Sequence, residues 1–89
     1  MKRLKPSHQF KKDLKRLAKR GNDLELARDI LNILANEQKI PEVYQPHFLH
    51  GEMEAYLECH IRPDWLLIWK EDREYIYLVR TGTHSDLFR

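Results

Sequence analysis

Residues 58–88 have the sequence ECHIRPDWLLIWKEDREYIYLVRTGTHSDLF, and the rest of the chain is arranged around them. Residues 65–69 are apolar at every position, which is typical of a central strand buried on both faces. Residues 75–80 are rich in aromatic and β-branched side chains and predict a further strand. A polar turn over residues 70–73 joins the two segments, so the pair predicts the end of a β-meander.

An alternation of apolar and polar residues precedes this pair and predicts another strand over residues 53–60. The polar face of that strand carries His60, and a break at Arg62-Pro63-Asp64 separates it from the next strand. Its apolar face consists of Met53, Ala55, Leu57 and Cys59. The meander therefore contains three predicted strands.

The N-terminal part predicts a short strand followed by an amphipathic helix. Residues 2–5 form an edge strand that ends at Pro6, since proline lacks the N–H donor that a central strand requires. Ser7 is placed to cap a helix over residues 8–20, and Gly21 ends it in the position favoured for a left-handed cap. The apolar stripe of this helix consists of Phe10, Leu14, Leu17 and Ala18.

A tight turn leads to a second helix, for which Asn22 or Asp23 is the expected cap. Its apolar positions extend the helical pattern from Leu24 to about Glu37, so the two helices predict an antiparallel hairpin. Periodicity fails over residues 38–51, where Pro and Gly indicate a loop. This loop carries His47 and His50.

The order β, α, α, β, β, β predicts an α+β fold, with the N-terminal strand and helical hairpin packed on one face of a small antiparallel sheet. Residues 1–89 are expected to form a single domain, because a chain of 89 residues supports only one modest core. It has neither an apolar run of about 18 residues nor a signal peptide, so we expect no membrane partner and a cytoplasmic protein. The single Cys59, which cannot form an internal disulfide, fits a reducing compartment.

The net charge of +2 conceals two halves of opposite sign. Residues 1–20 contain nine Lys or Arg and one acid, Asp13, which gives +8, and the rest contains seven Lys or Arg and thirteen acids, which gives −6. A basic block of this size attracts phosphate backbones or an acidic protein partner. A solvated helix face is an equally good explanation of the same charges.

Histidines and one aspartate are the candidates for acid–base chemistry. Imidazoles titrate near neutral pH, so His47, His50, His60 and His84 can exchange protons under physiological conditions. A surface or hydrogen-bonded histidine is the alternative for each of them. Asp64 follows His60 by four residues and either orients a histidine, acts as a general base, or bonds its own backbone in a turn.

Other residue types in the same region bind phosphates and bases. Arg80 lies at the end of a predicted strand, where its planar guanidinium suits bidentate phosphate binding, although an ordinary salt bridge is the alternative. Trp65 and Phe88 either stack on nucleobases or belong to the core. The histidines and Asp64 are also metal-ligand types, but no HExxH or CxxC motif is present, so we expect no metal site.

The chain resembles the YafQ-like branch of the RelE/ParE toxin superfamily in His47, Gly51 and two longer runs. These runs are Glu58-Cys59-His60-Ile61-Arg62-Pro63-Asp64-Trp65-Leu66-Leu67-Ile68 and Arg80-Thr81-Gly82-Thr83-His84-Ser85-Asp86-Leu87-Phe88. The segment Phe10-Lys11-Lys12-Asp13-Leu14-Lys15-Arg16-Leu17 and the pair Arg20-Gly21 are similar to that branch as well, so the likeness spans nearly the whole chain.

The resemblance implies a RelE-like fold and a ribosome-dependent messenger RNA endonuclease, the toxin half of a toxin–antitoxin pair. In such enzymes the 2′-hydroxyl of the RNA attacks the neighbouring phosphate, and no metal or other cofactor takes part. Implied partners are an acidic antitoxin encoded nearby, the ribosome and its mRNA, and operator DNA only through the antitoxin complex. The implied catalytic residues are His47, His60, Asp64, His84 and Arg80, and the implied substrate-binding residues are Trp65, Phe88, Lys11, Lys15, Arg16 and Lys19.

Within this set we expect His84 to protonate the leaving 5′-oxygen, and Asp64 or His60 to accept the proton of the 2′-hydroxyl. The chain has Pro46-His47 where members often have Asp-His, and Trp69 where they often have Tyr. The alternatives are a ParE-like toxin that inhibits a topoisomerase without catalysis, and a metal-dependent hydrolase.

Overall fold

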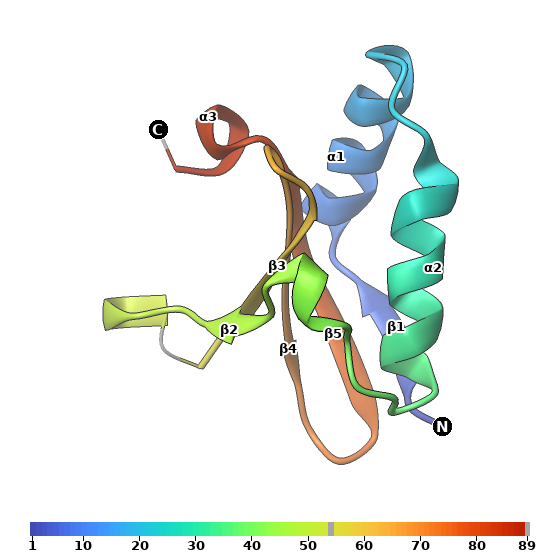
Figure 1. The fold of residues 1–89 in the computed structure, drawn as a ribbon, viewed down its shortest axis with the longest axis vertical. Helices are drawn as coiled ribbons and strands as arrows, with labels where there is room; N and C mark the ends of the chain where they lie inside the picture. The colour runs from blue at the N-terminus through green and yellow to red at the C-terminus, as the bar shows by residue number, and fades with distance from the viewer. Residues whose placement is uncertain (54, 89) are drawn as a thin grey trace.

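A five-stranded sheet forms the centre of the protein, and two helices cover one of its faces (Figure 1). The structure is a computed structural model and describes residues 1–53 and 55–88. In chain order its elements are β1 (Arg3–Pro6), α1 (His8–Lys19), α2 (Leu24–Ala35), the 3-10 helix η1 (Glu42–Tyr44), β2 (His47–Phe48), the 3-10 helix η2 (Gly51–Met53), β3 (Leu57–Arg62), β4 (Trp65–Glu71), β5 (Tyr75–Gly82) and α3 (His84–Leu87).

The strand order is β1-β5-β4-β3-β2, so the meander β3-β4-β5 occupies the middle of the sheet. This confirms the predicted α+β class and the helical hairpin on one face. One part of the prediction was wrong: β1 pairs with β5 in parallel, which makes the sheet mixed and not purely antiparallel. A four-residue edge strand has no feature that distinguishes the two directions, because its side chains are exposed along its length.

The ends of the helices follow the capping residues. The side chain of Ser7 accepts a hydrogen bond from the Phe10 N–H at 2.9 Å, as predicted, and its hydroxyl also donates to the Val79 carbonyl at 2.9 Å. Asp23 caps α2 by accepting from the Glu25 N–H. Helix α2 ends at Ala35, two residues before the predicted end, and Glu37 has a left-handed φ of 56°.

Four short elements were absent from the prediction. Strand β2 and the helix η1 lie in the segment predicted as a loop, η2 lies where that loop meets the predicted strand, and α3 follows the last strand. Strand β3 begins at Leu57 and not at residue 53, because residues 51–53 form η2; residue 54 lies outside the described residues. Elements of two to four residues are too short to produce a periodic apolar pattern.

The core lies between the helices and the sheet. Side chains from α1, α2, β3, β4 and β5 form it, and its largest members include Phe10, Leu17, Ile30, Trp65, Leu67 and Trp69. The opposite face of the sheet is left free of α1 and α2 (Figure 1), and it is bordered by α3 and by the β2–η2 segment. Among the described residues, no helix has both the length and the apolarity that crossing a membrane requires.

Candidate functional site

Three imidazoles form a row at one end of the sheet. The ring centroid of His60 lies 6.2 Å from that of His47 and 6.1 Å from that of His84. Phe88 continues the row, with its ring centroid 6.3 Å from that of His84. We call His47, His60 and His84 the histidine row.

The topology of the sheet explains why residues so distant in the sequence meet. Strand β2 pairs with β3 so that His47 lies opposite Glu58, two residues before His60. His60 lies opposite Leu66 of β4, and Leu66 lies opposite Gly82 of β5. Because α3 begins directly after Gly82, its first residue emerges beside His60. The histidine row is thus a consequence of strand register.

Both ring nitrogens of His47 face acceptors. Nδ1 lies 2.7 Å from the Gln45 carbonyl oxygen, and Nε2 lies 3.1 Å from Glu58 Oε1. A carbonyl oxygen only accepts, so the bond to Gln45 requires a proton on Nδ1. Glu58, which is 5% exposed, and the Gln45 carbonyl thus fix the orientation of the His47 ring from both sides.

Glu58 is a site residue that the sequence analysis did not single out. The signal was its position two residues before His60 on the same polar face of a strand. Glu58 supplies a carboxylate to His47. This chain has Pro46 before His47, where members of the YafQ-like branch often have an aspartate. Cys59 between them points into the core, where burial raises the pKa of its thiol to about 12.

Asp64 orients His84 through two hydrogen bonds to one oxygen. The His84 N–H donates to Asp64 Oδ1 at 3.0 Å, and His84 Nδ1 lies 2.9 Å from the same oxygen. Nδ1 therefore carries a proton, which leaves Nε2 free toward solvent. The hydrogen bonds from the His84 backbone and side chain hold the pKa of Asp64 below its ordinary value. Asp64 is thus an ionised partner of His84.

His60 has one occupied and one open ring nitrogen. Its Nδ1 lies 3.3 Å from the Pro63 carbonyl oxygen, so this nitrogen donates and Nε2 of the neutral ring is an acceptor. A hollow of about 480 Å³ opens beside this ring, between η1 and the end of β3, and its lining includes Tyr44, His60 and Arg62.

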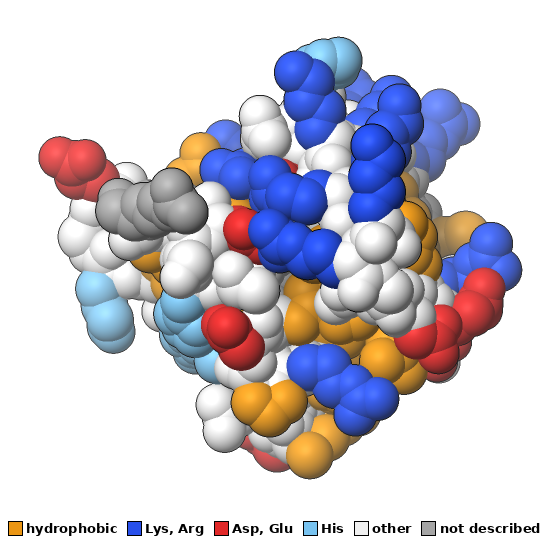
Figure 2. Space-filling model, turned by 90° about the horizontal axis from the view of Figure 1, so that it is seen from above, with side chains coloured by type: hydrophobic (Ala, Val, Ile, Leu, Met, Phe, Trp, Pro, Cys, Tyr) orange, Lys and Arg blue, Asp and Glu red, His pale blue; other side chains and the backbone are white. Residues whose placement is uncertain are grey.

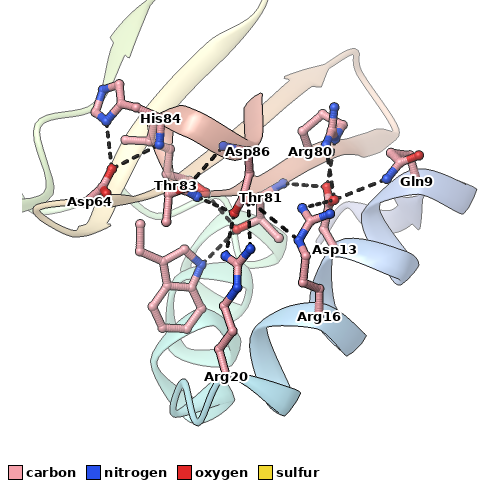
Figure 3. Close-up of polar contacts among 12 residues, drawn as sticks. Gln9, Asp13, Arg16, Arg20, Asp64, Arg80, Thr81, Thr83, His84 and Asp86 are labelled. Carbon is pink, nitrogen blue, oxygen red and sulfur yellow. Dashed lines mark hydrogen bonds and ion pairs between the residues drawn. The ribbon is translucent and has the colours of Figure 1, made fainter. Parts of the chain in front are cut away.

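Arg80 does not contact the histidine row. Its Nε donates to Asp13 Oδ2 at 2.8 Å and its Nη2 to Asp13 Oδ1 at 3.2 Å, which is the salt bridge that the sequence left open as an alternative. Figure 3 shows this pair beside α1, at the opposite side of the view from the pair Asp64–His84. Within residues 1–53 and 55–88, Nη1 of Arg80 has no hydrogen-bond partner.

Trp65 and Phe88, the two aromatic candidates, lie in different environments. Trp65 is 3% exposed, and its indole N–H donates to Thr81 Oγ1 at 2.9 Å, so base stacking by Trp65 does not fit the structure and its place is in the core. The reason is that β4 is flanked by strands on both sides and Trp65 faces the helices. Phe88 is 46% exposed next to His84.

The basic residues of α1 also divide into two groups. Lys11, Lys15 and Lys19 are exposed. Arg16 differs, because its Nη2 donates to Asp13 Oδ1 at 2.8 Å and its Nε lies 3.9 Å from Asp86 Oδ1. Figure 2 shows Lys and Arg side chains gathered over much of this end of the molecule, with His side chains on the left of the view and at its top edge.

Asp13 is a fully buried carboxylate that holds several donors together. Besides Arg16 and Arg80, it accepts from the Thr81 N–H at 3.1 Å and from Gln9 Nε2 at 3.3 Å (Figure 3). Burial by itself raises the pKa of Asp13, but the hydrogen bonds from Arg80, Thr81 and Gln9 outweigh it and leave the pKa below its ordinary value.

The sequence contained a signal for this role. Asp13 is the only acid among the first twenty residues, and it lies between Phe10 and Leu17 on the apolar stripe of the helix. A carboxylate on a buried stripe requires partners in the core.

A second carboxylate, Asp86, joins α1 to α3. It accepts from Arg20 Nη1 at 2.7 Å and Nη2 at 3.0 Å, and from the Thr83 N–H at 3.0 Å. The hydrogen bonds from Arg20 in particular hold the pKa of Asp86 far below its ordinary value.

Gly82→Ala is expected to lower the free energy of unfolding by about 1–3 kcal/mol. Gly82 has a φ of 152°, and an added Cβ would lie 2.8 Å from Asp86 Oδ2 and 3.0 Å from its Cβ. Gly21→Ala is the matched control, since Gly21 also has a positive φ, of 93°, but an added Cβ there meets nothing within 4 Å. Urea denaturation of both variants measures the difference, and equal losses would show that Asp86 moves aside without cost.

The protein is expected to lose stability in acid as the pH falls below the ordinary aspartate value of 3.8. The pKa values of Asp13 and Asp86 are lower in the folded protein, so the unfolded chain takes up protons first. Their contribution is therefore complete above that value and is lost as the pH approaches the folded pKa values. Urea denaturation at a series of pH values tests this, and Asp86→Asn should weaken the pH dependence; an unchanged dependence would contradict the assignment.

In the described part of the chain, no three His, Cys, Asp or Glu side chains come together in a way that could hold a metal ion.

Comparison with known proteins identifies the family. Residues 2–89 match the family described as "Bacterial toxin of type II toxin-antitoxin system, YafQ". The mRNA interferase toxin YafQ of Escherichia coli strain K12 is 37% identical over 83 residues, which cover 92% of this chain and 90% of the relative. The crystal structure of the E. coli DinJ–YafQ complex contains a chain that matches with a TM-score of 0.92 at 34% identity, covering 100% of both chains. A metal-bound toxin from Helicobacter pylori matches with a TM-score of 0.92 at 40% identity, covering 99% of this chain and 100% of that one. The chain therefore belongs to the YafQ family of bacterial toxins of type II toxin–antitoxin systems, as the runs around His60 and His84 predicted.

Proposed function

We propose that this protein is an endoribonuclease toxin that cleaves mRNA on the ribosome without a metal ion. The histidine row carries the proposal, because its neighbouring imidazoles of His60 and His84 each have an open nitrogen, so together they can deliver and accept protons at one phosphodiester. The E. coli relative, named an mRNA interferase toxin, supports the choice of substrate.

In the proposed reaction the 2′-oxygen bonds to phosphorus while the bond from phosphorus to the 5′-oxygen breaks. The products are a 2′,3′-cyclic phosphate and a 5′-hydroxyl, so one proton leaves the 2′-oxygen and one reaches the 5′-oxygen. His60 is the better base, since its Nε2 is an open acceptor. The hydrogen bonds from His84 lower the pKa of Asp64 and make it a weaker base. His84 is the acid, because the hydrogen bond from its Nδ1 to Asp64 fixes the ring and its Nε2 faces outward.

The remaining side chains would bind the substrate. His47, whose ring is fixed by Gln45 and Glu58, would line the place where negative charge develops on the phosphoryl oxygens. Arg80 can contribute to phosphate binding only through its Nη1, which Asp13 leaves open, or through its positive charge. Phe88 is exposed beside His84 and offers a stacking surface, and the hollow next to His60 has room for an adjacent nucleotide. The phosphate backbone would run toward Lys11, Lys15 and Lys19.

The proposed partners follow from the same surfaces. An acidic antitoxin encoded next to the toxin gene would bind the basic side of α1 and cover the histidine row. The E. coli relative has been solved in a complex named DinJ–YafQ, which supports an antitoxin as partner. The ribosome and its mRNA are the proposed cytoplasmic targets, and operator DNA would be bound only through the antitoxin complex.

Mapping of mRNA 5′ ends after induction tests the proposal. We expect new 5′-hydroxyl ends in translated messages, with 2′,3′-cyclic phosphates on the upstream fragments, and neither with His84→Ala. A fully toxic His84→Ala protein would refute the catalytic role. Growth arrest with inhibited supercoiling and uncut mRNA would instead indicate a topoisomerase inhibitor.

A metal must be tested separately, because the H. pylori relative was solved in a metal-bound form. Purified toxin is dialysed against a strong chelator and then transferred to metal-free buffer. It should retain its cleavage rate on translating ribosomes. Loss of activity that zinc or copper restores would overturn the metal-independent mechanism.

A further inference from the structure

Helix α3 carries the proposed acid, His84, yet apolar packing does not hold it. The helix has only four residues and none of them is buried. A helix this short has no stability of its own, because starting a helix costs more free energy than the hydrogen bonds of a single turn provide. Its position must therefore come from polar contacts with the rest of the chain.

The capping box of α3 provides the local contacts. The Thr83 hydroxyl accepts from the Asp86 N–H at 3.1 Å, and the Asp86 carboxylate accepts from the Thr83 N–H at 3.0 Å. These bonds fix the shape of the turn. They do not fix where the turn lies relative to the sheet and to the other histidines.

Two contacts attach α3 to elements that precede it in the chain. One consists of the two hydrogen bonds from the His84 N–H and Nδ1 to Asp64, and the two side chains are 58% and 65% exposed, so this contact is weak on its own. The other joins Asp86 to Arg20, which lies 66 residues earlier at the end of α1. Both terminal nitrogens of the Arg20 guanidinium donate, each to its own carboxylate oxygen, and such a paired geometry is the strongest that arginine makes.

The Asp86 side chain is 11% exposed and has little freedom to leave this contact. Arg16 adds a second positive charge 3.9 Å from Asp86, and Gly82 leaves the space that the carboxylate occupies. Helix α1 is itself anchored in the core by Phe10 and Leu17. The contact between Arg20 and Asp86 thus connects helix α1, which is anchored in the core, to helix α3, which has no such anchor.

We propose that Arg20 is a positioning residue of the cleavage site, which fixes α3 through Asp86 and thereby holds the His84 imidazole beside Asp64 and His60. The proposal rests on the proposed function, in which His84 is the acid. Arg20 touches no reacting atom in this arrangement. Its effect reaches the chemistry through two residues, Asp86 and His84.

The competing explanation is that Arg20 belongs to the basic surface of α1 and binds RNA directly. The two explanations predict different couplings. If Arg20 acts through Asp86, the losses caused by Arg20→Ala and Asp86→Asn overlap, and the double variant is no worse than the more damaged single variant. If Arg20 binds RNA independently, the two losses multiply. Asp86→Asn is chosen because an amide oxygen can still accept from the Thr83 N–H and preserve the cap.

The first experiment is this double-mutant cycle, measured as cleavage of a defined mRNA on purified ribosomes. We expect Arg20→Ala to lower kcat by up to about 100-fold with little change in KM, as for a displaced catalytic group. Lys12→Ala is the control: it removes one positive charge from the same helix, and Lys12 is exposed and makes no ion pair with a described residue. A rise in KM with unchanged kcat, or multiplied losses in the double variant, would overturn the proposal.

The second experiment needs no RNA and separates this proposal from the proposed function. Nitrogen-detected histidine spectra of the free protein report the hydrogen bond between His84 Nδ1 and Asp64. We expect Arg20→Ala to shift or broaden the His84 signals toward those of Asp64→Asn, while the His8 signals and those of Lys12→Ala stay as in the native protein. Unchanged His84 signals in a folded Arg20→Ala protein would refute positioning, whether or not the protein cleaves mRNA.

Discussion

Asp13→Ala is expected to lower the free energy of unfolding by about 3–5 kcal/mol, the loss that follows when one partner of a buried ion pair is removed. The Asp13 carboxylate is 0% exposed and is the shared acceptor of Arg80 Nε, Arg16 Nη2 and the Thr81 N–H. Alanine leaves a buried N–H and two guanidinium groups without their carboxylate. A small domain has a total stability of only about 5–15 kcal/mol, so the variant should be partly unfolded at 37 °C.

Urea denaturation followed by circular dichroism measures this loss. Asp13→Asn should be less damaging than Asp13→Ala, since the amide oxygen can accept from Thr81 even though the charge is gone. Glu25→Ala is the matched control, because Glu25 also pairs with an arginine on a helix but is 66% exposed, and its removal should cost below about 1 kcal/mol. Equal losses at Asp13 and Glu25 would contradict the central role of Asp13.

His84→Gln is expected to reduce mRNA cleavage by about 10²–10⁴-fold, the usual contribution of a general acid or base. The fold should not change, because His84 is 58% exposed and its side chain bonds only Asp64 among the described residues. Asp64→Asn should have a smaller effect, since the amide oxygen can still accept from His84 but no longer stabilises its charged form.

Single-turnover cleavage on ribosomes compares these variants with native protein, and urea denaturation confirms that each is folded. His8→Gln is the control histidine, because His8 is exposed at the first position of α1, away from the histidine row. If His84→Gln kept more than a tenth of native activity, His84 would not be the proton donor.

The sequence predicted the central part of the fold because its signals there are periodic. The apolar run at residues 65–69, the alternation before His60 and the helical stripe of α1 each correspond to an element that the core requires. The direction of β1 and the existence of β2 could not be predicted, since both strands are exposed and their pairing is fixed by the rest of the sheet.

The same division applies to the site. The approach of His60 and His84 could be expected from two strand ends, but the approach of His47 depends on the pairing of β2 with β3. Trp65 and Arg80 show that a place in a family motif does not by itself reveal where a side chain lies. Both belong to the recognisable runs, yet the Trp65 indole is in the core and the Arg80 guanidinium faces Asp13. Asp13 and Glu58 were overlooked because their importance comes from burial, which a single sequence does not display directly.

The pairing of Arg16 and Arg20 with carboxylates changes what α1 offers to a polyanion. Both arginines of the helical segment are occupied, by Asp13 and by Asp86, so the outward charge of this helix is carried by lysines. An ammonium group is a point charge on a flexible stem with no fixed fork, so it attracts phosphate without dictating its orientation. The lysines of this helix would therefore attract an RNA strand without fixing its position along the helix. Contacts outside the helix would have to set the register of the RNA.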